Sequence, residues 1–122
     1  MTVVLDASAL LAYLKDEEGS TKVEAELVNG AVCGAANWSE VSLALHRAGR
    51  DWSLARSLLM SFSLDIHEVT IADAEYASAL WRPGSGLSLG DRLCLALGHR
   101  LAMDVLTADR AWGVTDGIRY IR

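Results

Sequence analysis

The chain has 122 residues, of which 52% are hydrophobic and 22% are charged, and its net charge is −5. This length fits one domain, residues 1–122, and the composition supports a packed core and excludes a disordered chain. The acidic balance argues against generic nucleic-acid binding, which needs a basic face, and suits a basic protein partner. No apolar run approaches the roughly 20 residues of a membrane span, so we expect a soluble cytoplasmic protein without membrane contact.

The first half of the chain alternates short apolar runs with amphipathic segments. The elements expected there are a strand over 2–6, helices over 7–19 and 20–30, a strand over 31–36 and a helix over 37–49. Ser20 and Asn37 stand directly before periodic apolar patterns, which is the usual place of a helix N-cap. We therefore predict that Ser20 caps the helix over 20–30 and that Asn37 caps the helix over 37–49.

The second half continues the alternation. The elements expected there are a helix over 51–62, a strand over 64–69, a helix over 70–81, a loop over 82–86, a helix over 87–100, and strands over 104–109 and 117–121. Asp51 and Thr70 are the predicted N-caps of the first two of these helices. Strands that alternate with helices indicate an α/β domain with a mainly parallel sheet of four to five strands.

Four acids recur at equivalent places in this pattern. Asp6 and Asp109 each end a predicted strand, whereas Glu40 and Asp91 each lie in the first turn of a predicted helix. In open parallel sheets, the carboxyl ends of strands and the starts of the following helices share one edge, where ligands bind. The pattern therefore predicts an acidic site at that edge.

Helix capping is the alternative explanation for each acid taken singly. "NWSE" and "SLGD" both have capping-box spacing, and Asp6 could cap the helix that follows it. Asp91 is less simply explained, because positions 91, 95, 98 and 102 share one helical face and the other three are Leu, Gly and Ala. A residue that only caps a helix on an exposed surface would not need to share a helical face with such apolar or small residues.

Acids that converge on one edge need a cation. Two carboxylates about 4 Å apart repel by about 4 kcal/mol at an effective dielectric constant near 20. Oxygen ligands without nearby His or Cys favour Mg²⁺ or Mn²⁺ over zinc, and such ions activate water toward phosphate esters. The residues thus indicate a metal-assisted phosphoester hydrolase, and the net negative charge does not exclude a nuclease.

Two other acid-bearing α/β classes fit poorly. A response-regulator receiver domain requires a lysine late in the chain, whereas the lysines here are Lys15 and Lys22. A phosphatase with an aspartyl nucleophile requires Asp-x-Asp after the first strand, whereas this chain has "DAS" there.

The motifs "VVLDASALLAYL", "NWSEV", "LSLGDRLCLALG" and "VLTADRAW" resemble, in order, those of a PIN-domain ribonuclease, and more narrowly of a VapC-type toxin of toxin–antitoxin pairs. The resemblance implies a PIN-like three-layer α/β/α fold and cleavage of RNA with Mg²⁺ or Mn²⁺. It implies a metal-binding and catalytic set formed by Asp6, Glu40, Asp91 and Asp109. Ser8 and Thr107 match hydroxyl positions of the first and last motifs and would support the acids.

The last motif departs from some relatives. They carry a further acid three residues after the position of Asp109, where this chain has Trp112. Asp116 lies further along, and whether it joins the site is open.

The resemblance also implies partners. A VapB-like antitoxin would bind the toxin with a C-terminal segment across the active site, and the toxin would form a homodimer or a hetero-oligomer with the antitoxin. Arg92 and Arg110 adjoin proposed metal ligands and are candidates for RNA phosphate contacts. The alternative is a catalytically inactive PIN-like module that binds protein or RNA.

The cysteines and tryptophans favour structural roles. Cys33 and Cys94 stand alone in apolar surroundings, which is typical of buried thiols rather than of a disulfide or metal site. The four tryptophans could stack on bases, although their dispersal beside apolar positions favours core or interface packing.

Overall fold

A computed structural model describes residues 2–113 and 115–122. In this part of the chain, five parallel strands form one sheet in the order β3-β2-β1-β4-β5. The strands are β1 (Val4–Leu5), β2 (Val32–Gly34), β3 (Asp65–His67), β4 (Val105–Thr107) and β5 (Ile118–Tyr120). The predicted α/β class with a parallel sheet is confirmed.

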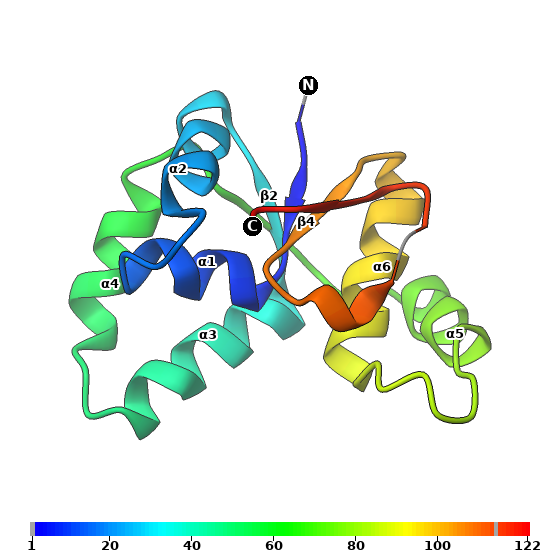
Figure 1. The fold of residues 1–122 in the computed structure, drawn as a ribbon. Coiled ribbons are helices and arrows are strands. Elements are labelled where there is room, and N and C mark those ends of the chain that lie inside the picture. Colours follow the sequence, from blue (N-terminus) through cyan, green and yellow to red (C-terminus); the bar gives the residue numbers. More distant parts are fainter. Residues whose placement is uncertain (1, 114) are drawn as a thin grey trace.

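Helices cover both faces of this sheet, as Figure 1 shows. They are α1 (Ala7–Leu14), α2 (Ser20–Asn29), α3 (Ala35–Arg47), α4 (Trp52–Met60), α5 (Ile71–Ala79) and α6 (Leu89–Leu101), followed by a short 3₁₀ helix η1 (Arg110–Trp112). The helices α1 to α4 lie on one side, and α5 and α6 lie on the other. The expected three-layer α/β/α arrangement is confirmed.

Side-chain alternation along the strands divides the interior into two cores. Val3 and Leu5 face the core beneath α1, α2 and α4, whereas Val4 faces the core beneath α6. Cys33 and Cys94 are both fully buried free thiols, one in each core, as predicted. Because burying a Val or Leu side chain contributes about 1.5–3 kcal/mol, the two cores hold the short strands in register.

Two predicted caps are wrong. Helix α3 begins at Ala35, directly after β2, with Gly34 as its N-cap and no side-chain cap. Asn37 therefore lies inside the helix, Glu40 lies in its second turn rather than its first, and "NWSE" forms no capping box. Helix α2 begins at Ser20 itself, with Gly19 as N-cap. Ala35 and Ala36 are strong helix formers, so the helix extends back to the end of the strand.

The remaining predicted caps are confirmed. The Asp51 carboxylate accepts a hydrogen bond from the Leu54 amide at 3.1 Å. Helices α5 and α6 each begin with a complete capping box, Thr70 with Asp73 and Ser88 with Asp91. "TIAD" and "SLGD" thus mark helix starts correctly.

Most of the tryptophans pack inside the protein. Trp38 and Trp52 meet edge to face with ring centroids 5.0 Å apart, and both pack against the first core. Trp112 is only 6% exposed, whereas Trp81 is 58% exposed. Packing therefore accounts for three of the four rings. None of the helices in the described residues combines the length and hydropathy needed to cross a bilayer.

Candidate active site

Three of the four predicted acids lie near one another at the carboxyl edge of the sheet. Asp6 follows β1, Glu40 lies on α3, and Asp91 lies in the first turn of α6. Burial raises the pKa of the Cys94 thiol, and the charges of Asp6, Asp91 and Glu40 raise it further. All three carboxylates are therefore close enough to this buried thiol of α6 to act on it.

Asp6 is the most buried of these acids, with 3% of its surface exposed. Its Oδ1 accepts a hydrogen bond from the Ala9 amide at 2.8 Å, which makes Asp6 the N-cap of α1. Its Oδ2 accepts one from the Thr107 hydroxyl at 2.6 Å, and the Ser8 hydroxyl lies 2.8 Å and 2.9 Å from the two oxygens. Capping and the site therefore use the same carboxylate.

Burial raises the Asp6 pKa from 3.8 to about 6, although the hydrogen bonds from Thr107, Ala9 and Ser8 lower it, and the Asp91 charge adds to the rise. Three donors thus do not compensate the cost of removing this carboxylate from water. A cation beside Asp6 would favour its charged form.

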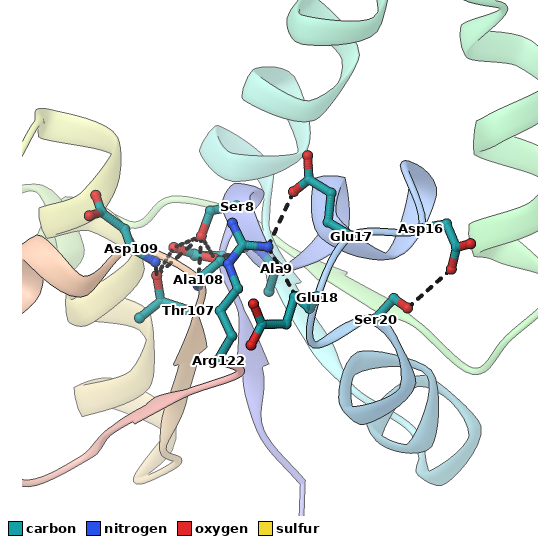
Figure 2. A network of polar contacts seen from close by, with 11 residues as sticks. Ser8, Ala9, Asp16, Glu17, Glu18, Ser20, Thr107, Ala108, Asp109 and Arg122 are labelled. Atoms are coloured by element: carbon teal, nitrogen blue, oxygen red, sulfur yellow. Dashed lines mark hydrogen bonds and ion pairs between the residues drawn. The ribbon is translucent and has the colours of Figure 1, made fainter.

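The two predicted supporting hydroxyls join the ends of β1 and β4. The Ala108 amide donates to the Ser8 hydroxyl at 2.9 Å, and the Asp109 amide donates to the Thr107 hydroxyl at 3.0 Å. Figure 2 shows this network, in which Ser8 and Thr107 lie together. The hydroxyls fix the Asp6 carboxylate against the loop that follows β4.

Asp91 closes its capping box, and its charge also acts on Asp6. Its Oδ2 accepts a hydrogen bond from the Ser88 amide at 3.0 Å, and its own amide donates to the Ser88 hydroxyl at 3.1 Å. The helical face predicted for it is only partly right, because Gly98 is buried whereas Ala102 is exposed and ends the helix with φ 54°. Asp91 therefore lies beside the buried face of α6 rather than on it.

Asp109 has a different orientation. Its Oδ1 accepts a hydrogen bond from the Ala111 amide at 2.9 Å and so caps η1. Figure 2 shows the Asp109 carboxylate turned away from Ser8 and Thr107. Its backbone is tied to the site through Thr107, and its place among the metal ligands stays a prediction.

Asp116 lies at the other end of the sheet. It precedes β5, and the first residue of β5 pairs with Val105, the first residue of β4. Because the strands are parallel, Asp116 is at their amino edge, opposite Asp6.

The two candidate arginines contact the protein itself. The Arg92 Nη1 donates to the Ala77 carbonyl at 3.0 Å, and its buried Nε has no hydrogen-bond partner among the described residues. The Arg110 Nε donates to the Arg122 carbonyl at 2.7 Å, and its guanidinium lies 4.9 Å from the centre of the Tyr120 ring. A role for Arg92 and Arg110 at RNA stays a prediction.

The chemistry of the acids fits a hard divalent cation, although the side chains are not closed around one point. Among residues 2–113 and 115–122, no three His, Cys, Asp or Glu side chains are close enough together to hold one ion. Mg²⁺ commonly takes only one or two carboxylates and keeps several waters, so a closed cage is not required. The donors offered by Asp6, Glu40 and Asp91 are all carboxylate oxygens, which such ions prefer.

The family model described as PIN domain matches residues 3–118. The chain belongs to the PIN domain family. No curated protein matches it.

Solved structures share the PIN fold at low sequence identity. A toxin–antitoxin complex from Klebsiella pneumoniae has a chain 18% identical, with a TM-score of 0.80 and 98% of both chains covered. VapBC2 from Rickettsia felis, bound to a DNA fragment from its promoter, is 13% identical with a TM-score of 0.73 and 98% of both chains covered. VapC20 from Mycobacterium tuberculosis, a sarcin–ricin loop cleaving toxin, is 17% identical with a TM-score of 0.68, over 94% of this chain and 92% of that one. These likenesses concern the fold.

The sequence interpretation of this PIN domain missed two residues that contact Glu40. Asn37, expected as a helix cap, is 2% exposed and donates to the Glu40 carboxylate. Gly90, which precedes Asp91, lies against the same carboxylate. The spacing of Asn37 and Glu40, three residues apart on one helix, is the signal that could have revealed the first contact.

Proposed function

We propose that this PIN domain is a metal-dependent endoribonuclease that acts as a VapC-type toxin. The observation that carries the proposal is that Asp6, Glu40 and Asp91, from three separate segments, lie near one another at the carboxyl edge of the sheet. A buried carboxylate whose pKa is raised by burial and by the nearby Asp91 charge is a costly arrangement for stability alone. A bound cation would relieve that cost.

In this proposal, Asp6, Glu40 and Asp91 hold Mg²⁺ or Mn²⁺, and Asp109 completes the set after its carboxylate turns inward. The bound ion would supply an activated water and offset charge on the phosphate. Ser8 and Thr107 hold the Asp6 carboxylate in one orientation through hydrogen bonds of 2.6–2.9 Å. The Ser88 amide holds one oxygen of Asp91, which leaves the other free to face the ion.

The toxin assignment draws on the fold and on charge. Structures of the same fold include a toxin–antitoxin complex and a toxin that cleaves the sarcin–ricin loop. The net charge of −5 would favour a VapB-like antitoxin whose basic segment crosses the acidic edge. The protein would act in the cytoplasm as a homodimer or as a complex with that antitoxin, and Arg92 and Arg110 would move onto RNA phosphates.

Cleavage of single-stranded RNA by purified protein tests the proposal. Asp91→Asn should lower the rate at least 100-fold in the presence of Mn²⁺, because the ion loses a charged ligand while the amide oxygen can still accept the Ser88 hydrogen bond. Asp116→Asn is the matched control, since it removes an exposed acid at the opposite edge of the sheet, and it should cleave as the wild type does.

Growth of bacteria that express the same variants tests the toxin role. The wild type and Asp116→Asn should arrest growth, and coexpression of a cognate VapB-like antitoxin should relieve the arrest. Asp91→Asn should not arrest growth. Equal arrest by all three proteins would favour the inactive PIN-like binding module instead.

A further inference from the structure

Asn37 is a buried polar side chain that helix α3 does not need. It is 2% exposed and lies inside the helix, where it caps nothing. A buried amide without hydrogen-bond partners destabilises the fold, so the partners of Asn37 show what keeps it there. Both of its hydrogen bonds lead to the candidate active site.

The Asn37 amide joins two elements of that site. Its Nδ2 donates to Glu40 Oε1 at 2.8 Å and to the Gly90 carbonyl at 3.2 Å. Both neighbours only accept hydrogen bonds, so the amide must present its nitrogen to them, because the flipped orientation would place oxygen against oxygen. The contact therefore ties Glu40 of α3 to the first turn of α6.

Gly90 provides the space that the Glu40 carboxylate occupies. A Cβ atom on Gly90 would lie 2.6 Å from Oε2 and 2.8 Å from both Cδ and Oε1 of Glu40. Glycine is less favourable in a helix than alanine, so its presence in α6 calls for a local reason. The close approach of the carboxylate supplies that reason.

We infer that Asn37 and Gly90 are positioning residues that fix the Glu40 carboxylate beside Asp91 for metal binding. Asn37 holds one carboxylate oxygen, and the bare backbone of Gly90 lets the group lie directly against α6. This inference rests on the proposed function, because it assigns the two residues a role in preparing the same metal site. Partners that orient a metal ligand typically change metal affinity by about 10- to 100-fold when they are removed.

Gly90→Ala separates positioning from folding. Alanine favours the helix, and the colliding atoms belong to the end of a flexible side chain, so the protein should fold at least as stably as the wild type. The added methyl group would push the Glu40 carboxylate away from Asp91. Asn37→Leu tests the other contact, because it keeps the side-chain volume and removes the donor.

Titration of the purified full chain with Mn²⁺, followed by calorimetry, provides the decisive measurement. Gly90→Ala and Asn37→Leu should each weaken Mn²⁺ binding about 10- to 100-fold, with a lower kcat for RNA cleavage and an unchanged KM. Asp73→Asn is the control, since it alters a buried polar residue of α5 that is not part of the candidate site, and it should bind Mn²⁺ as the wild type does.

Each outcome decides between the proposals. Wild-type Mn²⁺ affinity in folded Gly90→Ala would overturn the positioning role and leave the proposed function standing. A wild-type protein that neither binds Mn²⁺ nor cleaves RNA would overturn the proposed function and this inference with it. If Asn37→Leu fails to fold, Gly90→Ala decides the question alone.

Discussion

Replacing Asp6 with Asn should make the metal-free protein more stable while abolishing its activity. Asp6 is 3% exposed, and burial raises its pKa from 3.8 to about 6. Asparagine has nearly the same shape and carries no charge, and the Ser8 and Thr107 hydroxyls can turn to accept from its amide. The substitution therefore removes the cost of a buried charge and keeps the packing.

The size of the effect follows from the pKa. A shift from 3.8 to about 6, at about 1.4 kcal/mol per pH unit, corresponds to about 3 kcal/mol. The folded state keeps a proton that the unfolded state releases between these two values, so the wild type loses stability as the pH rises through this window. Below pH 3.8 Asp6 is protonated in both states and costs nothing.

Urea denaturation at several pH values, in the presence of EDTA, measures the difference. The free energy of unfolding of Asp6→Asn should exceed that of the wild type by up to about 3 kcal/mol above pH 7, and the difference should vanish near pH 3.5. Adding Mn²⁺ should stabilise the wild type and leave Asp6→Asn unchanged. A variant less stable than the wild type at pH 8 would refute the reasoning, because it would show that the Asp6 charge stabilises the fold.

Three further predictions concern the rest of the fold. Asp73→Asn should lower the free energy of unfolding at pH 7 by at least about 1 kcal/mol, because asparagine can still accept the capping hydrogen bond from Thr70 but loses the charge that pairs with Arg100. Because the hydrogen bond from Arg100 lowers the Asp73 pKa, the loss should disappear as the pH falls below 3.8 in thermal melts at several pH values. Burial raises the pKa of both thiols, so iodoacetamide should modify Cys33 and Cys94 only in urea, and mass spectrometry would detect any labelling of the native protein. Gly98→Ala should destabilise the protein by about 1–3 kcal/mol in urea denaturation, because a Cβ there would lie 2.7 Å from a β4 side chain; equal stability would contradict that packing.

The order and type of the helices and strands could be predicted because the apolar periodicity of each segment can be read from its own residues. Thr70 and Ser88 each precede a periodic apolar pattern and are followed three residues later by an acid, and both cap their helices as this local signal indicates. The start of α3 could not be predicted from the cap signal, because Ala35 and Ala36 continue the helix back to Gly34 and leave Asn37 inside it.

The edge of the sheet that gathers the acids could also be predicted, because parallel strands place their carboxyl ends together. The orientations of the acidic side chains at that edge could not be predicted. Asp109 follows β4 as expected, yet its carboxylate caps η1 instead of turning toward the other acids. Which of these two orientations the carboxylate takes depends on the geometry of the loop after β4. The contact of Glu40 with Gly90 joins residues 50 positions apart and leaves no local pattern in the sequence.

Cleavage of RNA by the purified wild-type protein, with the divalent ion as the only variable, tests the central claim most directly. The protein should leave a fluorescent single-stranded RNA intact in EDTA and cleave it when Mn²⁺ or Mg²⁺ is restored, with a rate that saturates as the ion is titrated. Cleavage at the same rate in EDTA, or none at any ion concentration, would contradict the account.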